Sequence, residues 1–157
     1  MTSIALNQPI PDFSGETTSG RTLQLADFRG KYLILYFYPK DNTPGCTREG
    51  QDFRDLYPEF LAANADVIGV SRDSIKSHEG FKCKYELPFE LLSDHDESLC
   101  GLFDVIKMKN MYGKQVRGIE RSTFLINPEG KLAAEWRKVS VDGHAAQVLA
   151  KLREVAA

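Results

Sequence analysis

The chain has 157 residues, of which 42% are hydrophobic and 10% are aromatic. This is enough to build one substantial core, so we expect a single domain over residues 1–157. The formal charge is -2, from 20 basic and 22 acidic residues that are mixed along the chain. Phosphate backbones require a basic stripe, and the sequence has none, so we do not expect nucleic acid as a partner.

The first residues, MTSIALNQPIPDF, have neither a basic segment nor an apolar run. They do not resemble a secretory signal, and no later stretch is suited to span a bilayer. We therefore expect a cytoplasmic protein without membrane contact. Three cysteines are too few for a disulfide scaffold, and an odd number cannot all pair within the chain. The useful question is whether one of them is reactive.

The first half of the chain predicts strands that alternate with helices. Residues 31–38, KYLILYFY, form an apolar and aromatic run typical of a strand buried on both faces. Apolar residues then recur with helical spacing, although a proline at position 58 should kink that helix. The expected order is strand 31–38, helix 46–61, strand 66–71, helix 74–86 with Asp73 or Ser74 as its cap, and strand 89–92.

The second half adds a short helix, a polar segment, a hairpin and a last helix. We expect the short helix over residues 96–104 and a loop or mobile insertion over 107–114. Residues 122–127 and 131–136 flank Asn-Pro-Glu-Gly, a sequence suited to a type I turn, and a helix starts at Asp142. Crossovers in the first half and a hairpin in the second predict an α/β fold with a mixed central sheet flanked by helices.

Cys46 is the candidate nucleophile. It follows Thr43-Pro44-Gly45 and opens a predicted helix, where free backbone N–H groups stabilise an anion such as a thiolate. The hydroxyl of Thr43 could bind the thiolate or a peroxide oxygen, and Pro39 could shield the thiolate from water. Local features alone leave open a plain junction between loop and helix with an incidental cysteine.

The pattern Pro39-x-x-x-Thr43-x-x-Cys46 after an aromatic strand resembles the active-site motif of the peroxiredoxins. The block FYPKDNTPGCTREG is similar to the bacterioferritin-comigratory, or PrxQ, subfamily, and PDF, VIGVS, LLSD and GIERSTFLINPEGK follow in family order. The resemblance implies a thioredoxin-like fold and a thiol peroxidase for hydrogen peroxide and organic hydroperoxides. It also implies no metal or organic cofactor, a monomer, and thioredoxin or glutaredoxin as the reductant.

The resemblance assigns two further residues to the site. Arg121 in IERSTF stands where the family has the arginine that holds the thiolate and the peroxide. Glu49 stands where family members orient that arginine, although on its own it would be interpreted as a solvated residue of the first helical turn.

The resolving cysteine has several candidates, because Gln51 occupies the position where many members of the subfamily carry it. Cys83, Cys100 and an external thiol remain. Cys83 projects away from the apolar face of its predicted helix, which suggests an exposed sulfur, and it lies one position after the resolver of some family members. Cys100 has apolar neighbours in the sequence, which is typical of a cysteine that is buried as a small hydrophobic residue. A Cys46–Cys83 disulfide would require local helix unwinding.

Three other functions compete with the peroxidase. A metal site could use His78 with Cys83 or His95 with Cys100, but the spacings are not those of ligand pairs, and the histidines are interpreted as surface or capping residues. A disulfide reductase needs C-x-x-C, whereas Thr43 stands where its first cysteine would be. A non-catalytic binding or chaperone module would keep the fold without the chemistry.

Overall fold

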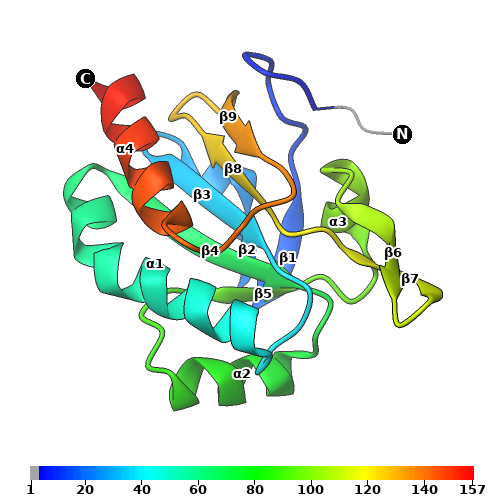
Figure 1. Ribbon diagram of the computed structural model, residues 1–157. Helices are drawn as coiled ribbons and strands as arrows, with labels where there is room; N and C mark the ends of the chain where they lie inside the picture. Colours follow the sequence, from blue (N-terminus) through cyan, green and yellow to red (C-terminus); the bar gives the residue numbers. More distant parts are fainter. Residues whose placement is uncertain (1–3) are drawn as a thin grey trace.

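The computed structural model describes residues 4–157 and is built around a sheet with the strand order β2-β1-β5-β4-β3-β8-β9 (Figure 1). Strand β3 is parallel to β4, and β4 is parallel to β5, whereas β1, β2, β8 and β9 join by antiparallel pairing. The strands span Ser14–Thr17 (β1), Thr22–Gln24 (β2), Tyr32–Phe37 (β3), Ala65–Ser71 (β4), Leu91–Ser93 (β5), Ser122–Ile126 (β8) and Leu132–Trp136 (β9).

Helices cover the sheet, and a separate two-stranded ribbon projects from one side of the molecule (Figure 1). The ribbon consists of β6, Ile106–Met111, and β7, Lys114–Ile119. The helices are Leu25–Phe28 (η1), Pro44–Ala62 (α1), Ile75–Lys84 (α2), Ser98–Leu102 (α3) and His144–Ala156 (α4). No helix in the described part of the chain is long and apolar enough to cross a membrane.

Strand β3 supplies both hydrophobic cores, because successive side chains of a strand point to opposite faces of the sheet. Leu33, Leu35 and Phe37 pack into one core, with residues of η1 and α3. Ile34 and Tyr36 pack into the other core, with residues of α1, α2 and α4. A strand that is buried on both faces is therefore continuously apolar, as its sequence indicated.

The predicted mixed α/β architecture is confirmed, and most of the predicted elements are present with shifts of a few residues. Ser74 is the cap of α2, since its Oγ accepts a hydrogen bond of 3.1 Å from the N–H of Ser77. The turn between β8 and β9 is also present, with Gly130 N–H donating to the carbonyl of Asn127 at 2.9 Å. Helix α1 continues past Pro58 to Ala62.

The prediction of a loop or mobile insertion over residues 107–114 is wrong. These residues belong to the β6–β7 hairpin, whose turn places Tyr112 and Gly113 at φ 53° and 79°. Two positive φ values are typical of the tight hairpin turns that match the strand twist. Much of this ribbon is exposed, and even the apolar side chains of Met108 and Val116 are exposed, so its apolar residues do not mark a buried face. Strands β1 and β2 were not predicted either.

Candidate active site

The loop between β3 and α1 places a cysteine at the start of a long helix. Asn42 has a left-handed φ of 64°, and Thr43 then occupies the N-cap position with an extended backbone. Pro44 begins the helix, which suits a residue that has no N–H to leave unpaired. Cys46 thus lies in the first helical turn, where it is only 1% exposed.

Strand β8 brings Arg121 to this helix end. Ser122 pairs with Phe37 of β3, so Arg121, one residue earlier, lies beside the loop that leads to α1. Its Nη2 donates to Cys46 Sγ at 3.4 Å. Gly45 leaves room for this approach, because a Cβ at that position would lie 3.2 Å from Nη2. A fixed positive charge therefore faces the sulfur at hydrogen-bond distance.

Glu49 holds the same arginine from the other side. Its Oε1 accepts a hydrogen bond of 2.6 Å from Arg121 Nη1, and its side chain is 1% exposed, so the solvated position considered for Glu49 alone is not what the structure shows. Burial raises the pKa of Glu49 to about 7, although the Arg121 charge opposes this shift. The buried carboxylate and the partly buried guanidinium form an ion pair beside Cys46.

Two buried polar atoms near this pair lack a hydrogen-bond partner among the described residues, Glu49 Oε2 and Tyr36 Oη. The Tyr36 ring stacks on Phe53 of α1 with a centroid distance of 4.6 Å. Burial, followed by the charges of Glu49 and Cys46, raises the pKa of Tyr36 well above its usual value. Nothing in the sequence of strand β3 indicates that Tyr36 feels the charges of Glu49 and Cys46.

Thr43 and Pro39 lie on the same loop as Cys46. The Thr43 hydroxyl donates to the carbonyl of Lys40 at 2.8 Å, so donation to the thiolate or to a peroxide oxygen requires it to rotate. Pro39 is half-buried and follows Tyr38 at the end of the central strand. The structure thus groups four of the predicted site residues, Thr43, Cys46, Glu49 and Arg121, at the N-terminus of α1.

The other two cysteines have contrasting environments. Cys83 lies on α2 and is exposed, as the helix geometry predicted. Cys100 is buried in the core on the other side of the sheet, as its apolar neighbours indicated. Burial and the nearby Asp94 carboxylate raise the pKa of Cys100 far above that of a free thiol. Of these two, Cys83 has the accessible sulfur.

The interpretation of His78 as a surface or capping residue is wrong. Its side chain is fully buried, and Nδ1 lies 2.8 Å from Oδ2 of Asp41, whereas His95 is exposed. Asp41, Asp73 and His78 bring one potential metal ligand each to within 4.8 Å of one another, but these atoms bond protein partners. The local sequence around His78 does not indicate this network, because Asp41 lies 37 residues away.

Comparisons with known proteins agree on one family. A model of the AhpC/TSA family matches residues 6–135. The peroxiredoxin Bcp of Xanthomonas campestris is 55% identical over 155 residues, which cover 98% of this chain and 97% of that protein. The peroxiredoxin Bcp of Bacillus subtilis is 50% identical over 153 residues, which cover 98% of each chain.

Solved structures give the same result for the fold. A PrxQ of Xylella fastidiosa with a cysteine changed to serine superposes with a TM-score of 0.93 at 45% identity, covering 100% of both chains. The bacterioferritin comigratory protein of Xanthomonas campestris, studied for alkyl peroxide reduction with a trapped intermediate and ligand, gives 0.90 at 51% identity, again over 100% of both chains. The predicted thioredoxin-like fold is confirmed.

Proposed function

This chain belongs to the AhpC/TSA family and is a thiol peroxidase of the peroxiredoxin Bcp group, and from this we propose that Cys46 is the nucleophile that attacks the peroxide. The observation that carries the proposal is the 3.4 Å contact between Arg121 Nη2 and Cys46 Sγ at the start of α1. A helix N-terminus and a guanidinium both favour negative charge on that sulfur.

The chemistry is a displacement at oxygen. The Cys46 thiolate attacks one oxygen of ROOH, the S–O bond forms as the O–O bond breaks, and the electron pair leaves with RO⁻. Protonation then gives an alcohol, or water when the substrate is hydrogen peroxide. The sulfur is oxidised by two electrons to a sulfenic acid. Arg121, the backbone N–H groups and a rotated Thr43 hydroxyl stabilise the charge that moves onto the leaving oxygen, and Pro39 shields the thiolate.

We assign the resolving step to Cys83. Its thiol attacks the sulfur of the Cys46 sulfenic acid, which forms a disulfide and releases water. The exposure of Cys83 and the burial of Cys100 support this choice. Cys46 and Cys83 lie on different helices, and a disulfide needs Cα atoms within about 4.4–6.8 Å, so part of α1 or α2 must unwind in each cycle. Resolution by an external thiol is the alternative.

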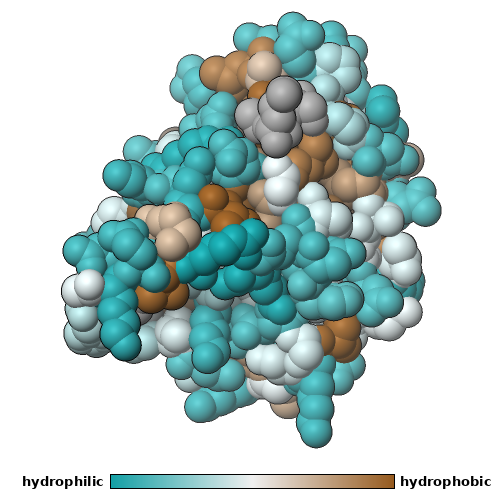
Figure 2. Space-filling view, turned by 90° about the vertical axis from the view of Figure 1, so that its right-hand side faces the viewer, coloured by the Kyte–Doolittle hydropathy of each residue, from teal (hydrophilic) through white to brown (hydrophobic). Residues whose placement is uncertain are grey.

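The remaining partners follow from the same proposal. Thioredoxin, or else glutaredoxin, reduces the disulfide, and hydrogen peroxide and organic hydroperoxides are the substrates. We expect a cytoplasmic monomer that forms one domain over residues 1–157. On the face shown in Figure 2 the hydrophobic side chains form small patches separated by hydrophilic ones.

One titration tests both steps. The reduced protein receives one equivalent of hydrogen peroxide without a reductant, the free thiols are counted, and linked peptides are mapped by mass. An internal disulfide lowers the three thiols to one, and the peptide masses identify its second cysteine. Cys46→Ser should abolish peroxide consumption, and the matched pair Cys83→Ser and Cys100→Ser should differ, with only Cys83→Ser blocking the disulfide. Peroxide consumption by Cys46→Ser at the wild-type rate would overturn the proposal.

A further inference from the structure

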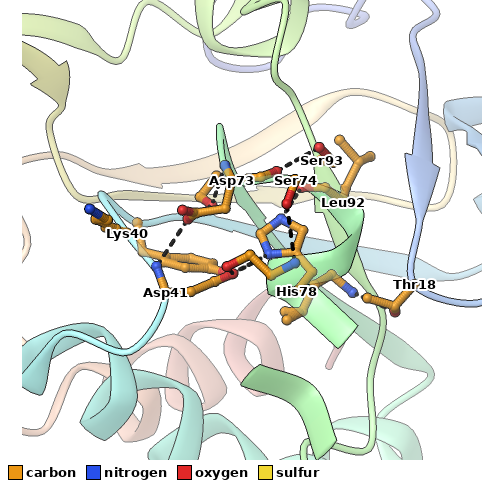
Figure 3. A network of polar contacts seen from close by, with 12 residues as sticks. Thr18, Lys40, Asp41, Asp73, Ser74, His78, Leu92 and Ser93 are labelled. Atoms are coloured by element: carbon orange, nitrogen blue, oxygen red, sulfur yellow. Dashed lines mark hydrogen bonds and ion pairs between the residues drawn. The ribbon is translucent and has the colours of Figure 1, made fainter. Parts of the chain in front are cut away.

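Asp41 is buried and is held at every polar atom of its side chain (Figure 3). Tyr38 Oη donates to Oδ1 at 2.6 Å, and Ser77 Oγ donates to Oδ2 at 2.8 Å. Its backbone N–H also donates, to Asp73 Oδ2 at 2.9 Å. The residue lies in the loop between β3 and α1, and these contacts tie that loop to the segment between β4 and α2 and to α2 itself.

The contact of Asp41 with His78 must contain a proton. His78 Nε2 lies 3.1 Å from the carbonyl oxygen of Leu92, and because a carbonyl only accepts, Nε2 carries a hydrogen. His78 Nδ1 lies 2.8 Å from Asp41 Oδ2. Two bare acceptors would repel each other at this distance, so a proton lies between them. The result is a hydrogen bond of 2.8 Å between two buried side chains, a setting in which such a bond is stronger than in water.

The loop between β3 and α1 connects Asp41 to the active site. Lys40 precedes Asp41, and its carbonyl accepts the hydrogen bond from Thr43 Oγ1. Asn42 follows in a left-handed conformation, and Thr43 occupies the N-cap position of the helix that carries Cys46. If Asp41 shifted, the Lys40 carbonyl, the Thr43 hydroxyl and the start of α1 would shift with it.

We propose that His78 is a positioning residue for peroxide reduction, which acts through Asp41 on the loop that presents Thr43 and Cys46. Its ring is fixed at Nε2 by β5 and at Nδ1 by the loop, so it holds the loop against the sheet. This inference rests on the proposed role of Cys46. Displacement of a reacting group by about 1 Å can lower a rate about 100-fold. A buried residue that fixes the position of the reacting group therefore affects the rate without contacting the substrate.

Two conservative substitutions separate the two hydrogen bonds of the His78 ring, at Nδ1 and at Nε2. The amide of His78→Asn can take the place of Nδ1 and keep the bond to Asp41, while losing the bond to Leu92. The longer His78→Gln can keep the bond to Leu92 while losing the bond to Asp41. Each variant loses one buried hydrogen bond, so their free energies of unfolding should fall by similar amounts.

The measurement is the second-order rate constant for oxidation of Cys46 by hydrogen peroxide, followed by rapid mixing and the fluorescence of Trp136. His78→Gln should be slower than wild type by about tenfold or more, and His78→Asn should recover most of that loss. Equal losses in the two variants, or no loss in either, would overturn the proposal. Circular dichroism must show both to be folded at the assay temperature.

A second pair decides the question if His78→Gln does not fold. Ser77→Ala removes another donor to Asp41 Oδ2, and Ser74→Ala removes the cap of α2 without touching Asp41. Ser77→Ala should slow Cys46 oxidation severalfold, and Ser74→Ala should leave it unchanged. The reverse order would contradict the positioning role. Cys46→Ser in the same assay tests the peroxidase proposal separately, because it changes neither hydrogen bond of His78.

Discussion

Arg121 divides its guanidinium between Glu49 and Cys46, with Nη1 2.6 Å from the Glu49 carboxylate and Nη2 3.4 Å from the Cys46 sulfur. A guanidinium is a rigid planar fork, so the position of one nitrogen fixes the other. Glu49 therefore determines where the positive charge lies against the sulfur. The pairing with Arg121 offsets part of the cost of burying the Glu49 carboxylate.

Arg121→Lys should lower the second-order rate constant for peroxide reduction by about 100-fold, similar to the loss of one donor from an oxyanion hole. Lysine keeps the charge, but a single ammonium cannot bond Glu49 and Cys46 in one plane. Arg117→Lys is the control, because Arg117 also pairs with a carboxylate, that of Glu97, but on the exposed hairpin. A rate for Arg121→Lys that matches Arg117→Lys would show that charge alone suffices.

Glu49→Gln should alter the pH dependence of activity near neutrality. Burial raises the pKa of Glu49 to about 7 in the folded protein, so the carboxylate that holds Arg121 is lost as the pH falls through this value. Wild-type activity should therefore decline on the acid side of pH 7, and the variant should be slower without this decline. Peroxide consumption over a pH series checks it. Glu59→Gln, at an exposed position of α1, should keep the wild-type profile.

The raised pKa of Glu49 also makes the free energy of unfolding depend on pH. Between the usual pKa of 4.5 and the folded value of about 7, the native state binds more protons at Glu49 than the unfolded state does. The contribution of this residue to the free energy of unfolding therefore falls as the pH rises through that window. Urea unfolding at several pH values should show a smaller fall for Glu49→Gln than for Glu59→Gln. Parallel curves for the two variants would contradict the raised pKa.

The sequence predicts the site more completely than it predicts what surrounds it. Cys46 and Thr43 lie within one local motif, so a helix start and a few residue types define them. Arg121 is 75 residues away from Cys46, and only a family resemblance joins the two. His78 was misjudged because its partners Asp41 and Leu92 meet it through tertiary packing. The β6–β7 hairpin was missed because an exposed ribbon carries no burial pattern.

Tyr36→Phe should stabilise the protein, and Tyr38→Phe should destabilise it. Tyr36 Oη is buried without a partner among the described residues, a situation that costs about 1–3 kcal/mol, so its removal should raise the free energy of unfolding by about 1 kcal/mol. Tyr38 Oη donates to Asp41 at 2.6 Å, and its loss leaves a buried carboxylate one donor short. Urea unfolding measures both. A less stable Tyr36→Phe would reveal a bound water that satisfies the hydroxyl.

Gly45→Ala should slow peroxide reduction without a large loss of stability. A Cβ at this position would lie 3.2 Å from Arg121 Nη2, so the guanidinium would have to move by a few tenths of an ångström away from Cys46. Gly80→Ala on α2 is the matched control, because a Cβ there meets no described atom within 4 Å. That control should raise the free energy of unfolding by about 1 kcal/mol through helix propensity and leave the rate unchanged. If Gly45→Ala reacts with peroxide as fast as Gly80→Ala, then the close approach of Arg121 to Gly45 does not contribute to catalysis.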